Sequence, residues 1–202
     1  MLTIIIVNWN VRDLLRACLR SLERHPASRH QQRIVVVDNA STDGSVAMLR
    51  DEFPTVHVVA SARNLGYGGG NNLGLAHAEQ LDSKAGQTTA DRPAYYLILN
   101  PDTEATPGAL DALLDYADAQ PDAGVVGPQL RYADGTAQSS RRRFPTLATA
   151  LFESTWLQPL APRRLLDNYY ARDRRDDETC DVDWLVGAAL LTRREVYQQV
   201  GG

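Results

Sequence analysis

Residues 2–10 read LTIIIVNWN, a continuous apolar run that ends in polar residues. An uninterrupted run of this kind, rich in β-branched residues, is typical of a strand that is covered on both faces, as strands are in a parallel sheet. Residues 14–22 then place leucines at helical spacing with arginines between them, which predicts an amphipathic helix. A buried strand followed by such a helix is the first unit of a repeating β–α pattern.

That pattern continues through the first hundred residues. Apolar runs predict further strands at residues 34–37, 56–59 and 95–99. Helices are expected at residues 45–53, where Pro54 ends the helix, and at about residues 72–81, after a glycine-rich turn. The composition of residues 82–93 is that of a polar surface loop.

The second half of the chain has a weaker pattern. Pro107 is expected to open a helix that runs through Ala119. Short strands are predicted at residues 124–127 and 129–132, with a hairpin turn at Asp134-Gly135. After an irregular stretch at 141–181, ordered structure returns at residues 182–191, and a last helix is expected at residues 193–200. The whole pattern predicts an α/β fold with a Rossmann-like, mostly parallel central sheet flanked by helices and a small antiparallel portion toward the C-terminus.

Composition limits the function classes. The chain has 202 residues, of which 44% are hydrophobic and 23% charged, the mixture of one ordinary globular domain. Its net charge of −4 argues against a nucleic-acid binder. Two cysteines, Cys18 in a predicted helix core and Cys180, make no disulfide framework, and no apolar run is long enough to span a membrane, so a cytoplasmic location is expected.

Polar side chains follow three of the predicted strands at the point where each strand ends. Asn8 and Asn10 follow the first strand, Asp38 the second, and Asn100 and Asp102 the fourth. The carboxyl ends of parallel strands meet at one edge of a sheet, and ligands bind there, so a ligand rich in hydrogen-bonding groups is expected. Each aspartate also suits a turn, so a structural role stays open; a lone carboxylate holds Mg²⁺ only when substrate phosphates complete the shell.

The third strand leads into RNLGYGGGNN at residues 63–72. The glycines either allow close helix packing or let backbone amides at a helix start approach a phosphate or sugar. The segment is not a dinucleotide fingerprint, because Asn71 stands where the final glycine should be and the run follows the third strand. The second interpretation makes Arg63, Asn64, Gly69 and Asn72 candidate ligand residues.

Four segments together resemble the family-two glycosyltransferases of the GT-A fold. These segments are IIIVNWN (4–10), VVVDNASTDGS (35–45), ARNLGYGGGNN (62–72) and ILNPDT (98–103), and VDWLVGAALLTRREV (182–196) looks like that family's acceptor-side segment. Within that family, LNPDT and SSRRRFPT (139–146) look most like the rhamnosyltransferase branch that builds bacterial surface polysaccharides. The match covers nearly the whole chain, which the resemblance divides into a donor-binding half at 1–103 and an acceptor-side half at 104–202.

The resemblance implies transfer of a sugar, with inversion, from a dTDP- or UDP-sugar to a saccharide or polyprenyl-diphosphate-linked acceptor. Asp38 would hold the base, and Asn100-Pro101-Asp102 takes the place of the family's DxD motif, with Asn100 replacing the first aspartate. Asp102 would then ligate a Mg²⁺ or Mn²⁺ ion that bridges the two phosphates. Together with the strand-end residues, the expected nucleotide site comprises Asn8, Asn10, Asp38, Arg63, Asn64, Gly69, Asn72, Asn100 and Asp102.

On the acceptor side, the resemblance places Gly187 and Ala188 beside the donor sugar. Trp184 suits either the core or a sugar-stacking platform. Arg142 and Arg143 are either a solvated charge run or a clamp for acceptor phosphates.

The C-terminal part carries two further expectations. Because basic residues occur between 163 and 175, we expect contact with the inner face of an anionic membrane, although neighbouring acidic residues reduce the local positive charge. The family's general base follows a Gly-Gly-Phe type turn, so it is expected beyond Gly202, and this chain is expected to bind donor but turn over poorly.

Two other function classes fit the pattern less well. A nucleotidyltransferase would carry a glycine-rich loop with a basic residue directly after the first strand, whereas residues 8–12 contain no glycine. A non-catalytic nucleotide- or sugar-binding module inside a larger assembly would lack turnover altogether. The four histidines have no mutual ligand spacing and are assigned no chemistry.

Overall fold

The computed structural model describes residues 1–84 and 94–201. The chain forms two compact units, one made of residues 1–126 with 187–202 and the other of residues 127–186. The second unit is therefore an insertion into the first. These boundaries come from packing, and the functional division at residue 103 stays a prediction.

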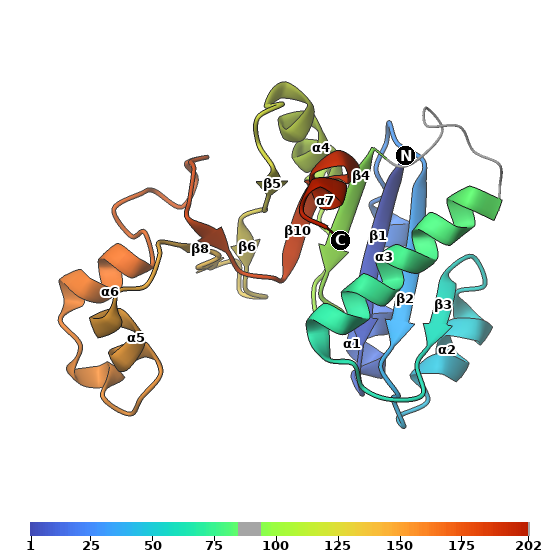
Figure 1. Ribbon diagram of the computed structural model, residues 1–202, viewed down its shortest axis with the longest axis horizontal. Helices are drawn as coiled ribbons and strands as arrows, with labels where there is room; N and C mark the ends of the chain where they lie inside the picture. The colour runs from blue at the N-terminus through green and yellow to red at the C-terminus, as the bar shows by residue number, and fades with distance from the viewer. Residues whose placement is uncertain (85–93, 202) are drawn as a thin grey trace. The chain divides into compact units, whose positions relative to one another are not determined.

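A six-stranded sheet forms the centre of the first unit (Figure 1). Its strands are, in spatial order, β3 (His57–Ala60), β2 (Gln32–Asp38), β1 (Leu2–Asn8), β4 (Tyr95–Leu99), β10 (Ala189–Arg193) and β5 (Val125–Val126). The first four are parallel, and β10 runs antiparallel to both of its neighbours. The predicted mostly parallel sheet is confirmed, and the four predicted strands of the first half are all present.

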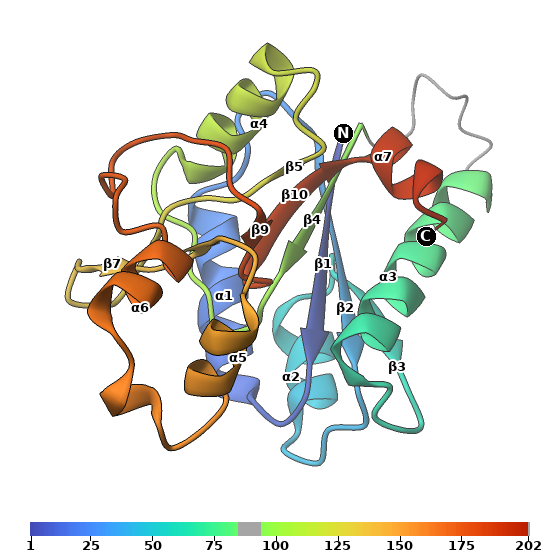
Figure 2. The same ribbon diagram turned by 60° about the vertical axis from the view of Figure 1, so that its left-hand side comes forward.

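Helices cover both faces of this sheet (Figure 2). They are α1 (Arg12–Arg24), α2 (Ser45–Glu52), α3 (Gly66–Lys84), α4 (Ala109–Ala119) and α7 (Arg194–Gln199). On one face, Leu75 and Ala78 of α3 pack with Ile5, Val35 and Tyr96 in a buried cluster. The opposite face is covered by α1 and α2, whose buried side chains include Cys18 at the predicted core position.

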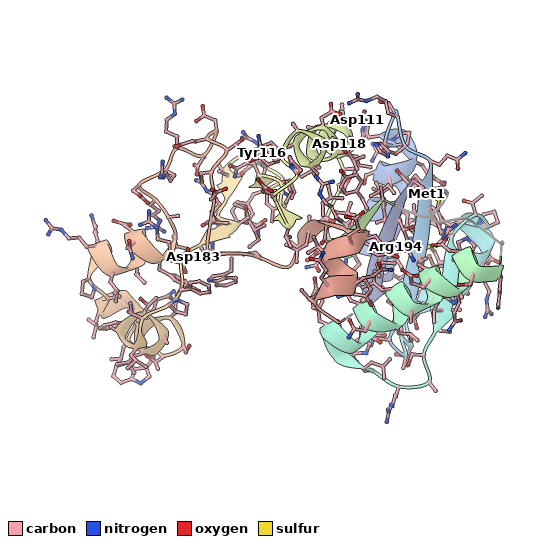
Figure 3. All side chains as sticks on the ribbon, turned by 45° about the horizontal axis from the view of Figure 1, so that its top comes forward. Met1, Asp111, Tyr116, Asp118, Asp183 and Arg194 are labelled. Atoms are coloured by element: carbon pink, nitrogen blue, oxygen red, sulfur yellow. The ribbon has the colours of Figure 1, made fainter. Side chains whose placement is uncertain are left out.

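Helix α4 is attached to the unit at both of its ends. Asp111 in its first turn accepts a hydrogen bond from the backbone N–H of Ser28 at 2.8 Å. Asp118 in its last turn accepts from the hydroxyl of Tyr95 on β4. Figure 3 shows both aspartates on this helix. The helix begins at Ala109 rather than Pro107, because Gly108 before it takes a positive φ of 75°.

Helix α3 corrects the prediction of a glycine-rich turn. It begins at Gly66, so the glycine run forms its first turns and the predicted start near Asn72 is wrong. A Cβ on Gly70 would lie 2.7 Å from Val7 Cγ1, and one on Gly74 would lie 2.6 Å from Ile5 Cγ2. These two glycines, one helical turn apart, therefore let the helix lie closer to β1 than any side chain would permit.

The end of α3 corrects a second prediction. The helix extends to Lys84, so residues 82–84 are not part of a loop, and residues 85–93 of the predicted loop lie outside the described residues. Asp82 is fully buried and forms an ion pair with Arg33 of β2 at 2.5 Å. A carboxylate is tolerated there because this cation compensates its loss of water.

The second unit consists of short elements. Two small antiparallel sheets, β6 (Leu130–Arg131) with β7 (Ala137–Gln138) and β8 (Arg141–Arg142) with β9 (Trp184–Leu185), accompany α5 (Leu147–Glu153), a 3-10 turn η1 (Gln158–Leu160) and α6 (Arg163–Tyr169). The predicted hairpin turn at Asp134-Gly135 is confirmed, with Gly135 at a φ of +83°. The irregular stretch predicted at 141–181 is wrong in part, because it contains two helices too short to show a clear period.

One predicted segment is divided between the units. Residues 182–191 supply β9 to the second unit and most of β10 to the first. Within the described residues, no helix is both long enough and apolar enough to cross a bilayer.

Candidate functional site

Asn8 and Asp38 form the buried floor of the candidate site. The parallel register of β1 and β2 pairs these two residues, so their side chains emerge on the same face of the sheet. Asn8 Nδ2 donates to Asp38 Oδ1 at 2.9 Å, and Asp38 Oδ2 accepts from the backbone N–H of Ser41 at 2.9 Å. Both Asp38 oxygens therefore accept a hydrogen bond from the protein, and each still has a lone pair for a ligand donor.

One polar atom of this floor lacks a partner. Asn8 is fully buried, and its Oδ1 has no hydrogen-bond partner among the described residues. Buried amide oxygens are normally satisfied, and leaving one bare costs about 1–3 kcal/mol. The atom is therefore suited to accept a hydrogen bond from a ligand.

Two loops of the site are tied together above this floor. Asn10 Oδ1 accepts from the backbone N–H of Thr42 at 2.8 Å, and the backbone N–H of Arg12 donates to Asp43 Oδ2, also at 2.8 Å. Asn10 and Ala40 both hold positive φ values, 55° and 61°. Non-glycine residues in that region cost energy and persist only where surrounding bonds fix them, so this rim is held in one conformation.

The loop before α3 exposes a cation. Asn64 Oδ1 accepts from the backbone N–H of Gly66 at 2.8 Å, which starts the helix. Arg63 is exposed, and its guanidinium has no hydrogen bond or ion pair to the described residues, so it can receive an anion. Gly69 and Asn72 are also exposed on the first turns of α3.

The turn after β4 places a free carboxylate at the same edge. The backbone of Asn100 is fixed, since its N–H donates to Ala188 O at 2.8 Å and its C=O accepts from Thr103 Oγ1 at 2.7 Å. Asp102 is exposed and forms no hydrogen bond or ion pair with the part of the chain that is described. No group of three or more His, Cys, Asp or Glu side chains there could hold a metal by itself.

Tyr67 and Gly187 connect α3 to the start of β10. The Tyr67 hydroxyl donates to Gly187 O, and a Cβ on Gly187 would lie 3.1 Å from Tyr67 Oη. Burial raises the pKa of Tyr67, so it stays a hydrogen-bond donor at neutral pH. Gly187 and Ala188 thus border the same edge as Asn100, and their expected place beside the donor sugar stays a prediction.

Sequence reasoning missed three polar residues at this edge, Asn39, Tyr67 and Asn71. Asn39 is buried, donates to Gly66 O at 3.1 Å and fixes the loop before α3. Asn71 is buried, and its Oδ1 has no partner among the described residues, whereas the sequence analysis selected the neighbouring Asn72 as the ligand residue. All three lie in segments singled out above, but only the packing of α3 against the sheet shows that Asn39 and Asn71 are buried while Tyr67 stays about half exposed.

The predicted acceptor-side residues meet in the second unit. The Arg142 guanidinium lies 4.5 Å from the ring centroid of Tyr170 and 5.9 Å from that of Trp184. Trp184 is 38% exposed, and its indole N–H donates to Arg143 O at 3.2 Å. Its position is thus intermediate between the two alternatives, core and open platform.

A polar cavity of about 460 Å³ lies next to Arg143. Its walls are Arg143, Arg164, Asp167, Asn168, Arg172 and Asp173. Arg143 pairs with Asp173 at 2.7 Å and Arg172 with Asp167 at 2.9 Å, so two of the three arginines that line this cavity are already neutralised. A bound phosphate would have to compete with these carboxylates.

Comparisons with known proteins find relatives of the whole chain. The model of the family described as Glycosyl transferase family 2 matches residues 3–201. The chain is 33% identical over 201 residues to the N-acetylglucosaminyl-diphospho-decaprenol L-rhamnosyltransferase of Mycobacterium tuberculosis, spanning 100% of this chain and 64% of that protein.

Two solved structures share the fold at lower identity. The mannosyltransferase PcManGT from Pyrobaculum calidifontis, in complex with GDP-Man and Mn²⁺, is 19% identical with a TM-score of 0.62 over 100% of this chain and 46% of that one. TarS of S. aureus in complex with UDP is 18% identical with a TM-score of 0.52, covering 75% of this chain and 44% of that one.

Proposed function

The chain belongs to glycosyl transferase family 2, and on this premise we propose that it binds a nucleotide-diphosphate sugar at the carboxyl edge of its sheet, as the donor-binding part of a rhamnosyltransferase. One observation carries the proposal: the edge holds two carboxylates that differ in burial and in hydrogen bonding. Asp38 is buried and doubly hydrogen-bonded, whereas Asp102 is exposed and unpaired within the described residues. The first suits recognition of a neutral group and the second suits a cation.

Asp38 and Asn8 would bind the base or ribose of the donor. The spare lone pairs of Asp38 accept from a base N–H or a ribose hydroxyl, and Asn8 Oδ1 gains the partner that it lacks. Arg63 would pair with the diphosphate, since its charge has no protein partner among the described residues. Both dTDP and UDP fit this pattern of groups.

Asp102 would hold a divalent cation together with the donor. Its free carboxylate oxygens are the ligand type that Mg²⁺ and Mn²⁺ prefer, and the donor phosphates would supply ligands that the protein does not. A bound cation would offset the charge that develops on the departing nucleoside diphosphate. Asn100 beside it adds hydrogen-bonding capacity without charge.

The acceptor side follows from the mycobacterial relative, whose name describes a polyprenyl-linked diphosphate acceptor. We assign to this chain L-rhamnose as the transferred sugar, with inversion, and a lipid-linked saccharide as its acceptor. Gly187 and Ala188 would border the sugar, and a Cβ on Gly187, 3.1 Å from the Tyr67 hydroxyl, would require that tyrosine to shift. Arg142, Arg143 and Trp184 would contact the acceptor.

The chain spans 64% of the length of this relative, so turnover of the whole protein is a separate question. The general base expected beyond Gly202 stays a prediction. Its test is to compare the rate of sugar transfer by residues 1–202 with that of a longer chain. Equal rates would contradict it.

Donor binding is tested by thermal shift with dTDP and UDP, each with and without Mn²⁺. A ligand at 100 times its dissociation constant stabilises the folded state by about 2.7 kcal/mol, so binding is readily detected. Asp102→Asn is expected to abolish the part of the shift that depends on Mn²⁺. Asp122→Asn is the matched control, because this exposed carboxylate precedes β5 at the opposite edge of the sheet. Equal effects of both variants, or no shift with either nucleotide, would contradict the proposal.

A further inference from the structure

Large apolar side chains are concentrated on one short stretch of the second unit. Phe144, Leu147, Leu151, Trp156 and Leu160 are each between 53% and 93% exposed. We call these five residues the α5–η1 face. Single exposed apolar side chains are normal on soluble proteins, whereas five within residues 144–160 are a local concentration of exposed apolar surface, which is typical of an interaction site.

The local fold explains why these side chains point outward. Leu147 and Leu151 are one turn apart on α5, so they share a face of that helix, and Thr149 on the other side is buried. Thr146 caps the helix by accepting from the backbone N–H of Thr149 at 3.1 Å. Helix α6 packs beside α5, as Figures 1 and 2 both show. The apolar side chains are thus fixed outward by the ordered structure.

The face carries almost no charge. Glu153 is the one ionisable residue between 144 and 162, and its carboxylate accepts from Gln158 Nε2 at 3.0 Å and from the Tyr170 hydroxyl. Removing this surface from water would therefore involve a single ion, the Glu153 carboxylate, which keeps hydrogen bonds from two neutral donors.

Unpaired positive charge follows the face directly. Arg163 and Arg164 are exposed, and neither forms an ion pair within the described residues. The other arginines near them are neutralised: Arg172, Arg174 and Arg175 each pair with a carboxylate. Of the basic residues at 163–175 that were expected to contact a membrane, only Arg163 and Arg164 therefore lack an acidic partner among the described residues.

We propose that the α5–η1 face, with Arg163 and Arg164, docks on an anionic lipid bilayer. Tryptophan and leucine beside arginine are the residues that enter the headgroup boundary, where the apolar side chains meet acyl chains and the guanidinium groups meet lipid phosphates. The two free arginines give the surface the charge complement of an anionic membrane. Docking needs neither donor nor cation, so the proposal goes beyond the proposed function and stands independently of it.

The test is co-sedimentation of the 202-residue chain with vesicles of phosphatidylcholine, with and without 30 mol% phosphatidylglycerol. Binding to the anionic vesicles is expected to exceed binding to the neutral ones. The double variant R163Q/R164Q is expected to bind anionic vesicles about 30-fold more weakly, roughly fivefold for each arginine at an anionic surface. The matched control R174Q/R175Q removes two arginines that are already paired and is expected to bind like the parent chain.

The apolar contribution has its own variant and its own readout. W156S/L160S is expected to weaken binding about tenfold or more, while Leu14→Ser, an exposed leucine of α1, leaves it unchanged. Trp156 fluorescence is expected to shift to the blue with anionic vesicles, and W156F should lose this shift yet still sediment. Circular dichroism and thermal shift with nucleotide establish that each variant is folded.

Three outcomes would overturn the proposal. They are no sedimentation with either vesicle, unchanged binding by folded W156S/L160S, and concentration-dependent self-association through the face without vesicle binding. A chain that binds vesicles but not nucleotide would refute the proposed function and leave this inference standing.

Discussion

Glu79 of α3 and Arg194 of α7 form a bidentate ion pair, with Arg194 Nε 2.8 Å from Glu79 Oε1 and Nη2 2.5 Å from Oε2. The hydroxyl of Tyr96 on β4 donates to the same carboxylate at 2.5 Å. Arg194 is labelled in Figure 3, on α7. These bonds fix the last helix to a segment more than a hundred positions earlier and hold β10 against β4.

Replacing Arg194 with methionine tests how much this pair contributes. The free energy of unfolding is expected to fall by about 2 kcal/mol, because the half-buried Glu79 carboxylate loses the guanidinium that compensates its charge. Urea denaturation measures the change. Arg24→Met is the control, since Arg24 pairs with Glu104 at 3.6 Å on the surface and should cost less than about 0.5 kcal/mol. Similar losses in both variants would show that burial does not matter here.

Two glycines of α3 are expected to respond oppositely to alanine. Gly74→Ala places a Cβ 2.6 Å from Ile5 Cγ2 and 3.0 Å from Val37 Cγ2, and forcing it in should destabilise the fold by about 1–3 kcal/mol. Gly68 has open space around its Cα, so Gly68→Ala should stabilise the helix by up to about 1 kcal/mol. The measurement is the melting temperature of each variant, which should be lower than that of the parent chain for Gly74→Ala and unchanged or higher for Gly68→Ala. A neutral Gly74→Ala would mean that α3 can move away from the sheet.

The thiol of Cys18 is expected to be inert in the folded chain. Burial raises its pKa from 9.0 to about 12, so almost no thiolate forms at pH 8. Alkylation followed by mass spectrometry should modify Cys180 first and Cys18 only in urea. Because the folded state keeps this proton while the unfolded state loses it, stability should also decline as pH rises from about 9 to 12. Rapid native labelling of Cys18 would contradict its burial.

Asp38→Asn is expected to weaken both the fold and the donor site. The new amide has only one oxygen, so it can accept a hydrogen bond from either Ser41 N–H or Asn8 Nδ2. The other of these two donors then faces the new NH2 group, which cannot accept. The cost should be about 1–3 kcal/mol in urea denaturation. Nucleotide binding should fall as well, measured by thermal shift. Retention of both would show that the carboxylate charge is dispensable.

Sequence alone predicted the strands because burial on both faces leaves continuous apolar runs such as LTIIIV at 2–7. It misplaced the start of α3, since glycine punctuates loops more often than it packs a helix on a strand. It also selected Asn72 over Asn71. Successive helix positions differ by about 100°, so choosing the inward one requires knowing which face of the helix meets the sheet.

Contacts between distant segments were beyond any local pattern. Tyr67 donates to Gly187, 120 positions away, and the sequence around either residue does not predict contact with the other. The engagement of Arg142 by Tyr170 and Trp184 is of the same kind. Motif order could place Asn8, Asp38 and Asp102 at one edge, because parallel topology alone does that.

The place of β10 between β4 and β5 has a consequence for folding during synthesis. Val125 and Val126 of β5 pair with Leu191 and Thr192 of β10, and the whole second unit separates these two strands along the chain. The ribosome therefore releases β4 and β5 well before β10, the strand that lies between them. Until β10 is made, the backbone groups of β4 and β5 that pair with it have no partner. Closing such a long-range pairing is slow and leaves apolar strand edges open to other nascent chains. Chains stopped before residue 189 should thus aggregate rather than accumulate as a smaller soluble fold.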